Sequence, residues 1–263
     1  MALATLGCTL PGPQTHESAT DAMRHSVVVG APLNGNVSVL SAGDPRGTVL
    51  ILVHGTPGSA SGWSDYLLDP PPGMEVVALD RPGFGRSSPE AAVPALDAQA
   101  AAVAALLPAD GRRAVLLGHS LGGAIVARVA IQHPQRVAAL VLLAASIDPG
   151  LETIHPMQHV GAWAPLRWLL PRAIRNANAE LMALQPELVA LAALLSQVTA
   201  PVIVVHGTRD DLVSVANVAF MQARLSGARC VKTMLLEGRN HFLPWNSAAK
   251  VREAISMAQE AAC

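Results

Sequence analysis

The chain contains 263 residues, of which 51% are hydrophobic and 14% are charged, a composition that excludes intrinsic disorder because disordered chains combine low hydrophobicity with high charge. The net charge is −1, from 18 Lys and Arg residues against 19 Asp and Glu residues, so the sequence lacks the basic excess of nucleic-acid-binding proteins. No apolar run reaches the ~18 residues of a membrane span, and the three cysteines are too sparse and too far apart to predict a disulfide framework or a zinc knuckle.

Residues 1–24 are predicted to be a flexible segment that precedes the folded domain. Residues 1–10 are apolar and uncharged, and a polar, proline-containing stretch follows them. A complete export signal would have a basic region and a longer apolar region. The run TLGC ending at Cys8 nevertheless resembles the end of a bacterial lipoprotein signal, although Leu6 stands where a small residue is usual. The protein is therefore expected to be cytoplasmic, or membrane-anchored and periplasmic if Cys8 carries lipid.

Two strand-like runs near the N-terminus predict a β-hairpin. Residues 25–33 and 35–42 alternate apolar and polar side chains on either side of Asn34-Gly35. Both positions of an Asn-Gly turn tolerate positive φ, which makes this pair a strong hairpin signal. Continuous aliphatic runs are typical of strands buried on both faces, and they predict further strands at residues 48–53, 74–79, 114–117, 138–143, 202–205 and 231–236.

Helical segments alternate with these strands, at residues 95–107, 121–132, 215–225 and 247–261. Such alternation predicts an α/β fold with a mostly parallel sheet flanked by helices. Residues 149–199 break the rhythm, because Trp163, Trp168 and several prolines lie between two predicted strands. We interpret them as a small helical lid or cap, inserted into a core made of residues 25–148 and 200–263, since long insertions carry lids and binding surfaces.

A candidate nucleophile, Ser120, lies in the run GHSLG between a predicted strand and a predicted helix. This is a G-x-S-x-G pattern in the strand–turn–helix context that a nucleophile elbow requires. The turn is too tight for side chains at Gly118 and Gly122, and it exposes the Ser120 hydroxyl above the edge of the sheet. The Leu121 N–H and the helix N-terminus are directed at the same place, which favours developing negative charge.

A serine needs a general base, and His241 is the best candidate because it follows the last predicted strand. Asp210 is the preferred carboxylate for orienting this histidine. It follows the strand at residues 202–205, and Ser, Asp, His is one of the chain orders in which triads occur. Asp211 and Asp148 stay open as alternatives.

Two glycine-containing loops follow other predicted strands. The run HGTPG at residues 54–58 lets backbone approach a ligand closely, and the Thr56 N–H would be an oxyanion donor beside the Leu121 N–H. The run DRPGFGRS at residues 80–87 lacks the spacing of a phosphate loop, and we interpret it as scaffolding. Likewise, we expect His54 to hold its loop by hydrogen bonds.

No metal or cofactor site is predicted. Glu152, His155 and His159 have a helix-like spacing that suits a metal, but a single triplet inside an insertion is a weak signal.

Five motifs resemble those of the α/β-hydrolase superfamily, in the same order along the chain: HGTPG, DRPGFGRS, GHSLGG, HGTRD and GRNHFLPW. The resemblance covers residues 25–262 and implies an eight-stranded, mostly parallel sheet with a lid after the sixth strand. Dehalogenases and epoxide hydrolases of the superfamily have Asp where this chain has Ser120, and the HGGG motif of another branch is missing. The serine esterase and lipase-like branch therefore fits best. The machinery that it implies is nucleophile Ser120, base His241, acid Asp210 and the oxyanion-binding N–H groups of Thr56 and Leu121.

These residues predict a serine carboxylesterase that hydrolyses a small, apolar ester through an acyl-enzyme, without a cofactor. The same triad can act on a carbon–carbon bond, a lactone, an amide or a peracid, and these alternatives stay open. An alternative of another class is a non-catalytic ligand-binding protein with this fold. Trp163, Trp168 and Phe242 are the candidates for the substrate pocket. Neither nucleic-acid binding nor a transmembrane span is expected, and the sequence does not define the oligomeric state.

Overall fold

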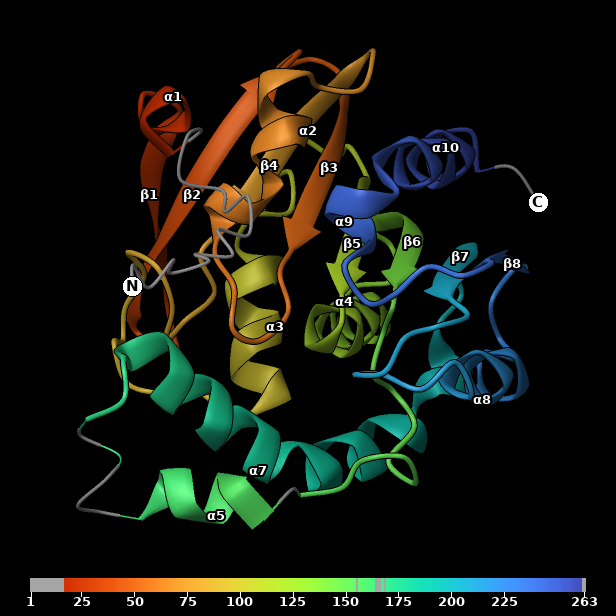
Figure 1. The fold of residues 1–263 in the computed structure, drawn as a ribbon. Helices are drawn as coiled ribbons and strands as arrows, with labels where there is room; N and C mark the ends of the chain where they lie inside the picture. Colours follow the sequence, from red (N-terminus) through yellow and green to blue (C-terminus); the bar gives the residue numbers. More distant parts are fainter. Residues whose placement is uncertain (1–16, 155, 164–166, 168, 262–263) are drawn as a thin grey trace, which may run out of the picture.

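The computed structural model describes residues 17–154, 156–163, 167 and 169–261. Its strands form one eight-stranded sheet in the order β1-β2-β4-β3-β5-β6-β7-β8 (Figure 1). β2 is antiparallel to β1 and β4, and the strands from β4 to β8 run parallel. The strands are β1 (Arg24–Val29), β2 (Gly35–Gly43), β3 (Thr48–Val53), β4 (Met74–Leu79), β5 (Ala114–His119), β6 (Val137–Leu143), β7 (Val202–Gly207) and β8 (Val231–Leu236). The predicted α/β class and mostly parallel sheet are confirmed.

The central strands β3, β5, β6 and β7 are buried along almost their whole length. Their sequences are nearly continuous aliphatic runs, as expected for parallel strands that helices cover on both faces. β8 lies at the edge of the sheet and is only partly buried. These buried strands therefore form a rigid frame, and this frame positions the loops that follow their carboxyl ends.

Helices cover the sheet in two layers, each with its own apolar core. Apolar side chains of α3, α4, α7 and α8 pack in one core, and those of α2, α9 and α10 pack in the other. The helices are α1 (Glu17–Asp21), α2 (Ser64–Leu68), α3 (Leu96–Ala104), α4 (Leu121–Gln132), α5 (Pro156–Ala162), α7 (Arg172–Ala192), α8 (Asn217–Arg224), α9 (Leu243–Asn246) and α10 (Ala248–Gln259), with 3-10 turns at Ala60–Trp63 and Leu195–Gln197.

The N-terminal hairpin forms, but its loop is longer than the predicted Asn-Gly turn. β1 ends at Val29, and residues 30–34 connect it to β2, with Asn34 at a φ of 49°. The predicted strand at residues 25–33 ends early because Pro32 has no backbone N–H for pairing.

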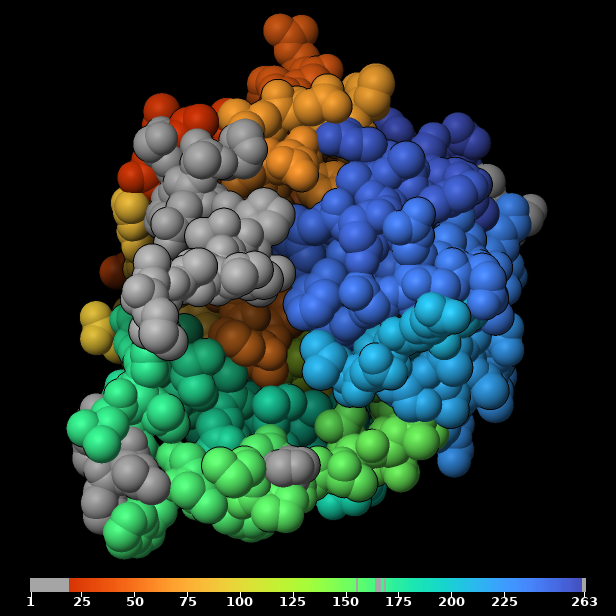
Figure 2. Space-filling view, in the orientation of Figure 1, coloured from red at the N-terminus to blue at the C-terminus, as the bar shows by residue number. Residues whose placement is uncertain are grey.

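The insertion between β6 and β7 carries α5 and α7, which lie along the lower side of the molecule in Figure 1. α7 runs through Pro186 and buries Leu184, Leu188 and Leu191 in the core that it shares with α4. In the space-filling view, the green and teal surface of this insertion adjoins the blue surface of the C-terminal part (Figure 2). Within the described part of the chain, no helix combines the length and apolarity that crossing a bilayer requires.

Cys230, the residue before β8, is disulfide-bonded. A single bonded cysteine differs from the disulfide framework that the cysteine spacing argues against. Cys8, the candidate for lipidation, lies outside the described residues, as do residues 1–16 in general. α1 follows directly, and its Asp21 pairs with Arg24 of β1.

Candidate active site

Ser120 occupies a strained turn between β5 and α4. Its backbone has a φ of 56° and a ψ of −124°, and residues with a side chain rarely adopt a positive φ. The Ser120 N–H donates to the Leu143 carbonyl of β6 at 3.0 Å. A side chain on Gly118 would collide with the backbone of Gly122, and one on Gly122 would collide with the Val53 carbonyl. The Ser120 hydroxyl does not cap the helix that follows, so it is available for chemistry.

The loop after β3 packs directly against this serine. A Cβ atom on Gly55 would lie 2.8 Å from the Ser120 Cβ atom, so glycine is required for this approach. Thr56 and Leu121 line the same pocket as Ser120, and their backbone N–H groups donate to no described residue. Leu121 is the first residue of α4, where backbone N–H groups lack an intrahelical partner. Two free N–H groups beside a hydroxyl can stabilise a developing oxyanion.

Arg81 supports this loop from its buried side. Its guanidinium donates from Nε to the His54 carbonyl at 3.0 Å and from Nη2 to the Gly55 carbonyl at 2.9 Å. The same group makes a two-pronged ion pair with Glu180 of α7, at 2.8 and 3.0 Å. Both side chains are buried. One arginine therefore joins the loop after β3 to the inserted helix.

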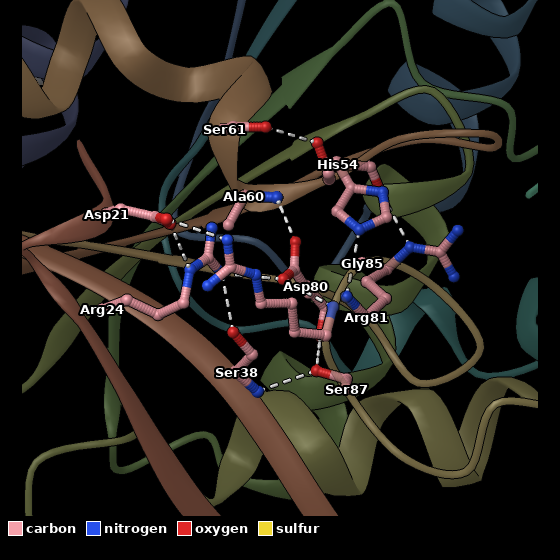
Figure 3. A network of polar contacts seen from close by, with 12 residues as sticks. Asp21, Arg24, Ser38, His54, Ala60, Ser61, Asp80, Arg81, Gly85 and Ser87 are labelled. Atoms are coloured by element: carbon pink, nitrogen blue, oxygen red, sulfur yellow. Dashed lines mark hydrogen bonds and ion pairs between the residues drawn. The ribbon is translucent and has the colours of Figure 1, made fainter. Parts of the chain in front are cut away.

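His54 and Asp80 complete this support, as Figure 3 shows. His54 accepts at Nε2 from the Arg81 N–H at 3.0 Å and donates from Nδ1 to the following carbonyl at 2.7 Å. Burial, with a further contribution from the Arg81 charge, holds the pKa of His54 well below its usual range. Asp80 accepts from the Ala60 N–H at 2.7 Å and from Arg24 at 2.9 Å. These contacts agree with the scaffolding role predicted for His54 and for residues 80–87.

His241, in the loop after β8, donates from Nδ1 to Asp210 Oδ2 at 2.7 Å. The other carboxylate oxygen accepts from the N–H groups of Leu212 and Val213, at 3.0 and 2.8 Å. Burial acts to raise the pKa of Asp210, but the hydrogen bonds from His241 and Val213 outweigh it and hold the pKa below its ordinary value. Asp210 is therefore an ionised acceptor that fixes the tautomer of His241 and leaves Nε2 as a proton acceptor.

The two alternative carboxylates lie elsewhere. Asp148 accepts from the Gly150 N–H at 2.8 Å, and Asp211 is exposed. Within the described residues, Asp210 is the carboxylate that bonds to His241.

Two buried histidines flank the His241–Asp210 pair. His119 donates from Nε2 to the His241 carbonyl at 3.0 Å, and the two ring centroids are 4.7 Å apart. His206 donates from Nε2 to the Val213 carbonyl at 3.0 Å and lies 3.5 Å from Asp210 Oδ2. Burial lowers the pKa of both rings, that of His119 to about 3. Both are neutral near pH 7, so they position their neighbours without adding positive charge.

Ser120, His241, Thr56 and Leu121 all line one pocket of about 510 Å³. The segments that follow β3, β5, β6, β7 and β8 contribute to it, which is the usual place for ligands in an open α/β sheet. Apolar and aromatic side chains form much of its wall: Trp63, Leu181, Leu212, Val213, Phe242 and Trp245.

Comparison with known proteins identifies the fold. A family model described as alpha/beta hydrolase fold matches residues 48–173. The chain has the α/β-hydrolase fold. The solved monoacylglycerol lipase of Paleococcus ferrophilus is similar to this chain with a TM-score of 0.70 and 18% identity, over 86% of this chain and 99% of that one. This likeness is one of fold.

Two curated proteins are similar to this chain over shorter stretches. A Pseudomonas 2-hydroxy-6-oxononadienedioate/2-hydroxy-6-oxononatrienedioate hydrolase is 32% identical over 49% of this chain and 47% of its own length. A Streptomyces lividans non-heme chloroperoxidase is 42% identical over 42% of this chain and 41% of its own length. The chain thus covers less than half the length of either relative.

On this α/β-hydrolase frame, the aromatic lining of the pocket differs from the sequence prediction. Phe242 lines the pocket, but Trp163 is 61% exposed beyond the end of α5 and is not among the described lining residues. Trp168 lies outside the described residues. Trp63 and Trp245 line the pocket instead. Both follow the loops that carry the site, and this proximity in sequence is the signal that could have found them.

Proposed function

We propose that this protein is a serine hydrolase that cleaves carboxylic esters through an acyl-enzyme. The observation that carries the proposal is the 2.7 Å bond from His241 to ionised Asp210, in a pocket that His241 shares with Ser120. A serine at a strained strand–helix turn, a histidine and a buried carboxylate are the parts of a catalytic triad.

In the proposed first step, His241 Nε2 accepts the proton of the Ser120 hydroxyl while Oγ bonds to the ester carbonyl carbon. The N–H groups of Thr56 and Leu121 stabilise the oxyanion. The intermediate then expels the alcohol, which takes its proton from His241. In the second step, water loses a proton to His241, attacks the acyl carbon and releases the acid, and the proton returns to Ser120.

We further propose that residues 149–199 act as a lid on this pocket. Leu181 of α7 and Glu152 are both part of the pocket wall. Glu180, next to Leu181, is held by buried Arg81. The lid would therefore help to define which substrates enter and would be fixed to the core by that ion pair.

An ester without carboxylate groups fits the pocket better than the dicarboxylate that the name of the Pseudomonas relative describes. Among the described lining residues there is no Lys or Arg, and the single charged side chain outside the proposed triad is that of Glu152. A carboxylate that enters an apolar pocket needs a cation or several donors to replace its hydration.

The test is hydrolysis of p-nitrophenyl esters from short to long acyl chains, with Ser120→Ala beside the wild type. We expect the substitution to lower turnover by about 10⁴-fold or more, because it removes the nucleophile. Ser256→Ala, at an exposed position on α10, is the matched control and should retain wild-type rates. A fluorophosphonate should label the wild type but not Ser120→Ala. Equal rates in wild type and Ser120→Ala would refute the proposal.

A further inference from the structure

Glu152 places a carboxylate on the wall of the pocket that holds Ser120 and His241. Among the described residues that line this pocket, it is the only Asp, Glu, Lys or Arg. The sequence groups Glu152 with His155 and His159, but His155 lies outside the described residues. In the structure, Glu152 lies in the wall of the pocket.

A buried serine fixes this carboxylate. Ser146 is 3% exposed, and its hydroxyl donates to Glu152 Oε1. The Ser146 N–H donates in turn to the Ser120 carbonyl at 3.3 Å. The carboxylate is therefore tied, through one residue, to the backbone of the proposed nucleophile. Glu152 makes no ion pair with any described residue, so its charge is available to a ligand.

The other titratable groups of the pocket do not balance this charge. Burial keeps the pKa of His54 and of His119 well below neutrality, so both rings are uncharged near pH 7. His241 is bonded to ionised Asp210, which adds a negative charge behind it. A pocket with low-dielectric walls and one sign of charge attracts ligands of the opposite sign.

Aromatic rings add to this preference. Trp63, Phe242 and Trp245 line the same pocket, and the faces of such rings attract cations, quaternary ammonium groups in particular. A carboxylate and aromatic rings together form the kind of surface that attracts a quaternary ammonium group by its charge, without a hydrogen bond.

We infer that Glu152 is a specificity-determining residue, and that the pocket selects esters carrying a positively charged ammonium group and rejects esters carrying a carboxylate. This inference rests on the ester hydrolysis proposed above. It assigns no part in bond cleavage to Glu152, which acts by binding the charged end of the substrate.

The experiment compares isosteric substrates that differ in charge, using the full chain. One pair is acetylcholine and 3,3-dimethylbutyl acetate, and the other is the p-nitrophenyl esters of γ-trimethylammoniobutyric acid and 5,5-dimethylhexanoic acid. The quantity is the ratio of kcat/KM for the cationic ester to kcat/KM for the neutral one. In at least one pair, Glu152→Gln should lower this ratio about tenfold, the effect of one partly solvated charge pair.

Asp148→Asn is the matched control, because Asp148 lies in the same loop, keeps its Gly150 contact through an amide oxygen and does not line the pocket. It should retain the wild-type ratio. A ratio that is unchanged in Glu152→Gln for both pairs overturns the inference while leaving ester hydrolysis intact, and so does an equal fall in Asp148→Asn.

If the protein hydrolyses no ester, binding decides the inference separately. Choline and 3,3-dimethylbutanol are titrated by calorimetry into Ser120→Ala and into Ser120→Ala with Glu152→Gln. About tenfold tighter binding of choline that disappears with Glu152→Gln supports the charged subsite. Equal affinities, or no detectable choline binding, overturn it.

Discussion

Asp210 is anchored on both sides of its carboxylate. One oxygen accepts from the N–H groups of Leu212 and Val213, and the other accepts from His241. The backbone donors fix the carboxylate before any substrate binds, and they favour its ionised form. Because the carboxylate cannot rotate away, the His241 ring has one preferred orientation, which is the pre-organisation that acyl transfer needs.

Replacing Asp210 with Asn should lower kcat by about 10³–10⁴-fold, because an amide cannot hold His241 in the required tautomer. Asp211→Asn and Asp148→Asn are the controls, since neither carboxylate bonds to His241 in the described structure. Both should stay within about threefold of the wild type, as expected of surface substitutions away from a site. Steady-state kinetics on the best p-nitrophenyl ester would measure this. A large loss of kcat in Asp148→Asn with none in Asp210→Asn would show that Asp148, and not Asp210, is the acid.

The sequence alone indicated the turn around Ser120, because the two glycines that the turn requires, Gly118 and Gly122, lie within the same five residues as the serine. The same reasoning could not find the partner of Arg81. Glu180 lies 99 residues later along the chain, and no spacing rule connects a strand-end loop to a helix in an insertion. Glu152 was likewise visible only as part of a spacing pattern, and its place in the pocket depends on Ser146.

α7 is attached to the core by polar contacts as well as by its apolar face. Glu180 pairs with Arg81, and Asn176 donates to the Gly83 carbonyl at 2.7 Å. Glu187 accepts from the Leu96 N–H at the start of α3. The buried ion pair is the contact whose loss should cost most, because a guanidinium left buried without a partner keeps its full desolvation penalty.

Glu180→Ala should lower the free energy of unfolding by about 3 kcal/mol or more, the usual cost of breaking a buried pair. It should also lower kcat, because Arg81 holds the Gly55 carbonyl of the proposed oxyanion loop. Glu90→Gln is the matched control, since Glu90, in the loop between β4 and α3, pairs with Arg172 of the same helix at 3.4 Å and its side chain is 82% exposed. Its effect should be below about 1 kcal/mol. Urea unfolding measures the change in the free energy of unfolding for each variant. Equal changes in the two variants would contradict the role given to the buried pair.

Across the whole molecule, alternation of strands and helices predicted the parallel sheet, and most strand bounds agree within a few residues. The length of the hairpin loop depended on Pro32, which interrupts an otherwise alternating run. Which helices share a core was not readable from the sequence, because α7 joins α3, α4 and α8 through contacts across the insertion. His119 is buried against His241 and Trp245, more than 100 residues later in the chain, so its burial was not readable from its neighbours in sequence.

Burial of neutral histidines makes the stability of the whole domain depend on pH. The folded pKa of His119 is about 3, whereas an unfolded histidine has a pKa near ~6.5. Between about pH 6 and pH 4 the unfolded chain therefore binds a proton at this site that the folded protein does not, and stability falls as the pH falls.

His54 adds to this dependence, because its pKa is also well below the ordinary value. Each such histidine contributes about 1.4 kcal/mol per pH unit within that window. His119→Asn should reduce the slope of unfolding free energy against pH by about this amount, since asparagine cannot take up the proton. Urea unfolding at several pH values and constant ionic strength measures the slope, with circular dichroism to confirm the folded state at each pH. An identical slope in wild type and His119→Asn would mean that His119 takes up its proton as readily in the folded protein as in the unfolded chain, which would contradict the lowering of its pKa by burial.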